Sequence, residues 1–129
     1  MTQGKTVLVI EDDQTTQALL CAAVRKAGAR AVAALDGMQG VMLARQQNPD
    51  LIILDLQLPA GRGEMVFERI KMLVSTSGIP VLVYTSTPAD QASQLIQDPS
   101  VEFLQKPLPP DQLVDVIRRK LNPDANPSS

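Results

Sequence analysis

Four short runs of Val, Ile and Leu constrain the fold of this chain more than any other feature of its sequence. They cover residues 7–10, 51–54, 81–84 and, more weakly, 103–105, and an Ala-rich run at 31–35 is a fifth candidate. The runs lack the alternation of polar and apolar side chains that is typical of a strand with one face in water. Near-continuous apolar runs of this length indicate strands buried on both faces, as in a parallel sheet.

Segments with helical periodicity separate these runs. Asp13 can cap a helix that continues to Lys26 and ends at Gly28. Further helices are expected at 38–46, 63–73, 88–96 and 111–121, and a pair of prolines before the last one suits a first helical turn. Strand followed by helix, repeated five times, predicts an α/β fold of the doubly wound kind, a five-stranded parallel sheet with helices on both faces.

Composition narrows the possible functions. The 129 residues suffice for one domain, and the absence of histidine, with Cys21 as the only cysteine, excludes an internal disulfide, histidine-based catalytic triads and cysteine or histidine zinc sites. A net charge of −2 and only three aromatic residues argue against direct binding of nucleic acid. The first apolar run is too short for a signal peptide or a membrane span, so we expect a cytoplasmic protein without membrane contact.

Polar side chains that can take part in binding or catalysis follow the predicted strands. In chain order they are Glu11 and Asp12, then Asp55, then Thr85 and Ser86, and finally Lys106. The carboxyl ends of parallel strands meet at one edge of the sheet, where ligands of doubly wound folds bind. An acid after a strand often only caps the next helix, as Asp13 can. Asp55 is harder to explain in that way, because a carboxylate at the end of a central apolar strand is costly unless it is paired or bound to a metal.

The joint occurrence of these groups indicates a specific chemistry. Three carboxylates that converge repel one another, and a divalent cation relieves that repulsion. Ligands that are all oxygens suit magnesium better than zinc. A cation and a lysine beside a carboxylate can receive a phosphoryl group, and the carboxylate itself can be the nucleophile that forms an acyl phosphate.

Four segments, in this order and at this spacing, resemble the receiver domain of bacterial two-component response regulators. They are VLVIEDD (7–13), PDLIILDLQLP (49–59), IPVLVYTS (79–86) and FLQKPL (103–108). The resemblance implies a flavodoxin-like (βα)5 fold with strand order 2-1-3-4-5. It places the receiver domain at 6–122, after a flexible N-terminus at 1–5 and before a disordered tail or linker remnant at 123–129.

The resemblance also implies roles for individual residues. Asp55 becomes the phosphoacceptor. The ligands of Mg²⁺, or Mn²⁺, become Glu11, Asp12, Asp55 and the backbone carbonyl of Gln57, with a contribution from Asp13 left open. The groups that bind the phosphoryl oxygens become Thr85, Ser86 and Lys106. Thr85 and Phe103 become the switch residues, Pro107 a candidate for a cis peptide bond, and Gln57 and Thr87 the residues that tune dephosphorylation.

The partners implied by the resemblance are proteins. A sensor histidine kinase or a histidine phosphotransfer protein would supply the phosphoryl group, and an effector protein or a lost output domain would read the result. The face formed by 88–96, 103–105 and 111–121 would change shape, and two copies could pair through it. Beyond its own phosphorylation and dephosphorylation, such a domain is not an enzyme.

Three alternatives compete with this interpretation. A receiver-like interaction module that is never phosphorylated would carry the same segments. A flavodoxin would need a phosphate-binding loop where this chain has three acids, which would repel a flavin phosphate. An aspartyl phosphatase typically has a second aspartate two residues after the nucleophile, where this chain has Gln57.

The segment 98–101 also departs from the Gly-Ala that receivers often carry, which predicts a short or displaced helix before it.

Overall fold

A computed structural model describes residues 4–59 and 62–123 of the chain, and strands and helices alternate throughout. The elements are β1 (Thr6–Ile10), α1 (Gln14–Lys26), β2 (Arg30–Ala34), α2 (Gly37–Gln47), β3 (Leu51–Leu54), α3 (Gly63–Met72), β4 (Val81–Thr85), α4 (Ala89–Leu95), β5 (Glu102–Gln105) and α5 (Pro110–Leu121). The expected alternation of strand and helix is therefore confirmed.

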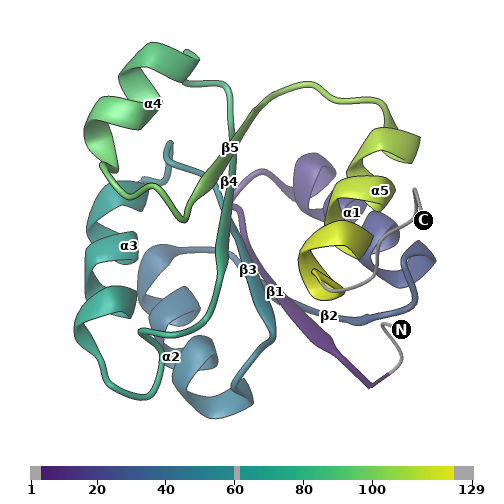
Figure 1. Ribbon diagram of the computed structural model, residues 1–129, viewed down its shortest axis with the longest axis horizontal. Helices are drawn as coiled ribbons and strands as arrows, with labels where there is room; N and C mark the ends of the chain where they lie inside the picture. Colours follow the sequence, from purple (N-terminus) through teal and green to yellow (C-terminus); the bar gives the residue numbers. More distant parts are fainter. Residues whose placement is uncertain (1–3, 60–61, 124–129) are drawn as a thin grey trace.

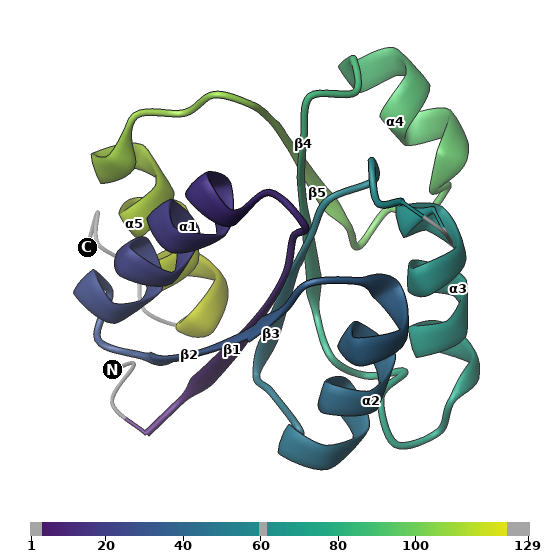
Figure 2. The same cartoon turned by 180° about the vertical axis from the view of Figure 1, so that it is seen from behind.

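The five strands form one parallel sheet in the order β2-β1-β3-β4-β5. Helices α1 and α5 cover one face of the sheet, and α2, α3 and α4 cover the other (Figure 1). The view from behind shows the same three layers (Figure 2). The doubly wound fold and the strand order implied by the resemblance are both confirmed.

The core consists of two apolar layers, one on each face of the sheet. Along β1, Val7 and Val9 pack toward α1 and α5, while Leu8 and Ile10 pack toward the helices of the other face. All four side chains are fully buried. Because both faces of the strand are covered, both sets of alternate positions must be apolar, which explains the uninterrupted runs in the sequence. Burial of each such side chain contributes about 1.5–3 kcal/mol.

The ends of α1 follow from local chemistry. The carboxylate of Asp13 accepts a hydrogen bond from the backbone N–H of Thr16 at 2.9 Å, so Asp13 is the N-cap. After the helix, Gly28 has a φ of 95°, a left-handed conformation that favours glycine. Cys21 on this helix is buried, as expected for a core residue.

Most element boundaries differ by one residue from the sequence-based expectation, and the differences at β2 and α4 have clear local causes. Strand β2 occupies residues 30–34 instead of 31–35, because its pairing with β1 ends at Ala34 and the N–H of Leu35 donates to the side chain of Gln39. Helix α4 occupies only residues 89–95, within the expected 88–96. Ile96 already has extended backbone angles, and the carboxylate of Asp98 then accepts hydrogen bonds from Ser100 in the turn that leads to β5.

The expected flexible ends fall largely on residues 1–3 and 124–129, which lie outside the described residues. Lys5, also assigned to the flexible N-terminus, has a backbone oxygen that accepts from Arg30 at 2.8 Å and an ammonium that donates to the carbonyl of Leu121 at 2.8 Å. Among the described residues, every helix is too short or too polar to cross a lipid bilayer.

Candidate functional site

Three candidate site residues lie one position beyond the end of a strand and are fixed there by the sheet itself. The backbone N–H of Glu11 donates to the last carbonyl of β2 at 3.1 Å, and that of Asp55 donates to the last carbonyl of β1 at 3.2 Å. The N–H of Lys106 donates in the same way to the last carbonyl of β4 at 2.8 Å. These residues therefore extend the hydrogen-bond ladders of the sheet by one residue. The ladder fixes the backbone positions from which their side chains project.

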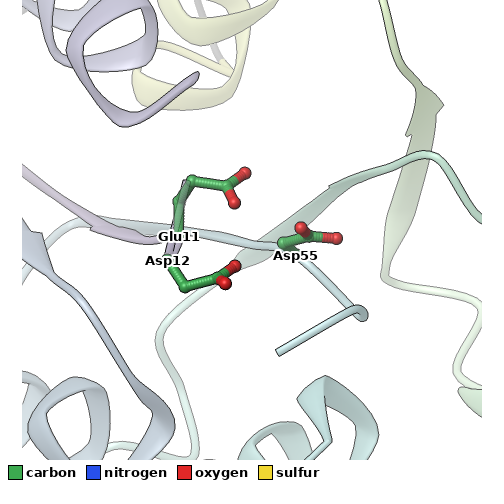
Figure 3. Close-up of side chains that lie close together, drawn as sticks. All are labelled: Glu11, Asp12 and Asp55. Carbon is green, nitrogen blue, oxygen red and sulfur yellow. The ribbon is translucent and has the colours of Figure 1, made fainter. Parts of the chain in front are cut away.

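The three acidic side chains predicted to hold a metal lie together at this edge. Figure 3 shows Glu11 and Asp12 at the end of β1 and Asp55 at the end of the neighbouring β3. One carboxylate oxygen from each residue lies within 4.8 Å of the others. Glu11 and Asp55 are only 1% and 4% exposed, whereas Asp12 is exposed to solvent. The cluster is thus half embedded in the protein and open on the side of Asp12.

Lys106 is the counter-ion of the two buried carboxylates. Its Nζ lies 2.6 Å from Oε1 of Glu11 and 3.1 Å from Oδ2 of Asp55. The other oxygens accept backbone hydrogen bonds, Oε2 of Glu11 from Asp13 at 3.2 Å and Oδ1 of Asp55 from Gln57 at 3.0 Å. Buried charges are tolerated when they are paired and hydrogen-bonded, and both carboxylates meet that condition.

The environment shifts the pKa values of two of these groups. Burial raises the pKa of the Glu11 carboxyl, and the charge of Asp55 raises it further, although the hydrogen bond from Lys106 opposes both. Burial by itself lowers the pKa of Lys106, but hydrogen bonds and charges from Glu11 and Asp55 outweigh burial and raise it. Lys106 is therefore held in its charged form.

The donor set fits a hard divalent cation. All three side chains offer carboxylate oxygens, the ligands that magnesium prefers. Lys106 brings one positive charge to three carboxylates, so negative charge remains in excess in this cluster. A divalent cation at the open side, next to Asp12, would neutralise that excess.

The hydroxyl groups at the end of β4 and just after it lie in two different environments. Thr85 is buried, and its Oγ1 accepts a hydrogen bond from the N–H of Thr87 at 3.2 Å. The hydroxyl of Thr87, a residue predicted to tune dephosphorylation, lies 3.2 Å from the same oxygen and is also buried. Ser86, between them, is exposed. Phe103 on β5 is partly buried, lies opposite Val83 and packs against the core layer under α2, α3 and α4.

The remaining predicted site residues have clear positions. The peptide bond between Lys106 and Pro107 is cis. The side chain of Gln57 is exposed, while its N–H contacts Asp55. Asp13 contributes its N–H to Glu11 and its carboxylate to the cap of α1.

Sequence reasoning missed two residues that support the site. The side-chain amide of Gln17 on α1 donates to the carbonyls of Glu11 at 3.0 Å and Ala34 at 3.2 Å, which ties the helix to the end of β1. The hydroxyl of Tyr84 accepts from the N–H of Leu108 at 2.9 Å, just beyond Lys106. A glutamine in a helix and an aromatic residue in a strand are ordinary in sequence, so neither carried a signal.

Comparison with known proteins gives the family. The family described as "Response regulator receiver domain" matches residues 7–118. The DNA-binding dual master transcriptional regulator RpaA of Synechocystis is 34% identical over 116 residues, which are 89% of this chain and 48% of RpaA. Protein PilH of Pseudomonas aeruginosa is 29% identical over 118 residues, which are 89% of this chain and 96% of PilH. The chain therefore spans about half the length of RpaA and nearly all of PilH.

A solved structure agrees with these relatives. The receiver domain of the sensor histidine kinase PA1611 from Pseudomonas aeruginosa, with a magnesium ion coordinated in its active-site cleft, superposes with a TM-score of 0.82 and 26% identity. The match covers 92% of this chain and 98% of that domain. The ends of the strands carry the acids, the hydroxyl and the lysine, and the family match includes all of them, so the chain belongs to the receiver domains of two-component response regulators.

Proposed function

We propose that Asp55 accepts a phosphoryl group from a phosphohistidine of a sensor histidine kinase or a histidine phosphotransfer protein. A carboxylate oxygen of Asp55 attacks phosphorus, the new P–O bond forms as the P–N bond breaks, and the imidazole nitrogen keeps the electron pair of that bond. The observation that carries the proposal is a nearly buried Asp55 at the end of β3, in contact with Lys106 and clustered with two further carboxylates.

The residues that would hold Mg²⁺, or Mn²⁺, are Glu11, Asp12, Asp55 and the backbone carbonyl of Gln57. When bound, the cation supplies positive charge that offsets the charge of the phosphoryl oxygens. The fit of the three carboxylates to a hard cation supports this assignment, as does the magnesium in the related PA1611 receiver domain. Asp12 is the exposed member of the cluster and gives a cation its route of entry.

Lys106 would change partners during the reaction. In the unphosphorylated protein its ammonium contacts both Glu11 and Asp55. A phosphoryl group on Asp55 brings new anionic oxygens to the same place, and Lys106 would pair with one of them. Because a raised pKa keeps this ammonium charged, it can stabilise the charge of the phosphoryl oxygens without a proton transfer. Thr85 and Ser86 would donate hydroxyl hydrogen bonds to the phosphoryl oxygens.

The conformational switch that we propose links Thr85 to Phe103. In the described structure Thr85 is hydrogen-bonded to Thr87. Attraction to a phosphoryl oxygen would draw Thr85 inward, and Phe103 would fill the space left behind. The face formed by α4, β5 and α5 would then shift between two conformations, and an effector, an output domain or a second copy of the chain would bind one of them. Gln57 and Thr87 would set the lifetime of the phosphorylated state.

The signalling unit in this proposal spans residues 6–122. Intact mass is measured after incubation with a small acyl phosphate in the presence of Mg²⁺ and, separately, of EDTA. We expect a gain of one phosphoryl group with Mg²⁺ only, and none in Asp55→Asn. Asp115→Asn, an exposed aspartate on α5, is the matched control and is expected to behave like the wild type. Asp12→Asn is expected to need a far higher concentration of Mg²⁺ for the same gain in mass.

The switch needs a separate measurement. Beryllofluoride with Mg²⁺ is added to ¹⁵N-labelled protein, and amide shifts in α4 and β5 are compared between the wild type and Phe103→Ala. We expect large shifts in the wild type and much smaller ones in the variant.

If no donor, including a panel of phosphorylated kinases, modifies Asp55, the chain is an interaction module with a receiver fold.

A further inference from the structure

A groove lies between α2 and α3, outside the site described above. It has a volume of about 600 Å³ and is lined by Met38, Val41, Met42, Arg45, Gln46, Arg69 and Ser75. The two helices lie side by side on one face of the sheet, with α3 between α2 and α4 (Figures 1 and 2). The groove is thus separated from the α4–β5–α5 face by the width of a helix.

Three apolar side chains of α2, Met38, Val41 and Met42, line part of this groove. Met38 and Met42 stand one helical turn apart on α2 and are 84% and 48% exposed. On the outer side of α3, Met65 and Met72 are 57% and 81% exposed. Long unbranched thioether side chains adapt to partners of different shape, and methionine is over-used at such binding surfaces. Exposed methionines on two adjacent helices therefore form an adaptable apolar surface next to the groove.

Two arginines give the groove its charge. Arg45 lies one turn beyond Met42 on α2, and Arg69 faces it from α3. Within residues 4–59 and 62–123, neither guanidinium makes a hydrogen bond or an ion pair with a side chain or the backbone. A guanidinium offers up to five N–H donors in a planar fork that matches a carboxylate. Two positive charges thus lie beside three apolar side chains in the lining of this groove, on a chain whose net charge is −2.

We propose that the α2–α3 groove binds an amphipathic helical segment of another protein, with apolar side chains among the methionines and carboxylates on Arg45 and Arg69. A helix laid in an apolar groove is a common mode of peptide recognition, with anchors at every third and fourth position. The arginines would fix its register through carboxylate pairs. This interaction involves no residue of the proposed phosphorylation site and takes place in the unphosphorylated protein.

Other occupants fit the charges less well. A symmetric pair of copies would place the same patch against itself, so the two arginines of one copy would face the like charges of the other. A nucleic acid would find only two cations and no aromatic side chain in the groove lining. An anionic membrane would need a surface rich in lysine and arginine, whereas the groove lining has two arginines.

The test uses the full chain without a phosphoryl donor and a displayed library of 14-residue helices. The library fixes Leu at the apolar positions and randomises the flanking positions among Glu, Gln and Lys. We expect selection to enrich Glu on the flanks and the selected peptides to shift the amides of α2 and α3. We expect the Arg45→Gln/Arg69→Gln variant to bind them at least tenfold more weakly.

The matched control is Arg25→Gln/Arg118→Gln, which removes two exposed arginines from the opposite face of the sheet and is expected to bind like the wild type. Urea unfolding of each variant verifies that the fold is intact. Enrichment of Lys, lack of any enrichment, or binding that does not depend on Arg45 and Arg69 would overturn the proposal. So would a dimer in sedimentation that Met42→Glu disrupts, or binding to vesicles of anionic lipid. Because Asp55→Asn should bind the peptides unchanged, this result is independent of the proposed phosphorylation.

Discussion

Gly63→Ala is predicted to damage the site without replacing any of its reactive side chains. Gly63 is the first residue of α3, and its N–H donates to the carbonyl of Leu56 at 3.1 Å. A Cβ at this position would overlap the carbonyl oxygen of Asp55 and the Cα of Leu56. These are backbone atoms at the end of a buried strand, so they cannot rotate away as the tip of a side chain can.

The size of the effect follows from two opposing contributions. Alanine is favoured over glycine within a helix by up to about 1 kcal/mol. Overpacking of a rigid environment costs about 1–3 kcal/mol, and contact with backbone on two sides places this case at the upper end. We therefore expect a net loss of about 2 kcal/mol in the free energy of unfolding. For a domain of this length that corresponds to a fall of about 8 °C in Tm.

Urea unfolding measures the stability, and intact mass measures the rate at which the small acyl phosphate modifies Asp55. We expect Gly63→Ala to displace the connection between β3 and α3. This displacement should slow the reaction about tenfold or more, because reacting groups must be aligned closely. Gly78→Ala is the matched control, since a Cβ there meets no atom within 4 Å. It should be neutral or stabilise the protein by up to about 1 kcal/mol. Gly63→Ala with the stability and rate of the wild type would refute the reasoning.

Three further predictions concern contacts away from the metal ligands. Tyr84→Phe leaves the N–H of Leu108 without its acceptor and should lower the free energy of unfolding by about 1–2 kcal/mol in urea titrations. Thr76→Val removes a buried hydroxyl that donates to a carbonyl in the last turn of α3 at 2.6 Å, and a similar loss is expected by thermal unfolding. Arg119 lowers the pKa of Glu102, so ionised Glu102 stabilises the fold at neutral pH, and this stabilisation is lost as the pH falls through the lowered pKa. Glu102→Gln should therefore cost less than about 1 kcal/mol at pH 7 and nothing in acid, which unfolding at several pH values would check.

Local patterns in the sequence are sufficient to predict the fold. Apolar runs without alternation, separated by helical segments, predict buried parallel strands, and the structure confirms this because both faces of the sheet are covered. The boundary of β2 was misplaced by one residue, since an Ala-rich edge strand has few apolar side chains to define where its pairing ends. The short α4 followed from the Asp98-Pro99 turn.

The candidate site was identified from residue types at strand ends and from the resemblance to receiver domains. That Glu11, Asp12 and Asp55 converge follows from the rule that parallel strands end at one edge, and the structure brings them within 4.8 Å. Their chemical roles remain predictions that the mass measurements test. The contacts of Gln17 and Tyr84 could not be foreseen, because they depend on which side chains of distant elements meet.

The sequence by itself determined the fold class, the family and the set of reactive groups, since these depend on local periodicity and on the residue that follows each strand. Only the tertiary structure decided that Lys106 pairs with both Glu11 and Asp55, and that two exposed methionines of α2 and the arginines Arg45 and Arg69 line one groove. The physical reason is the separation along the chain of the residues that interact. Periodicity is set by neighbours along the chain, whereas a charge pair or a groove depends on how the register of the sheet and the packing of its helices bring distant residues together.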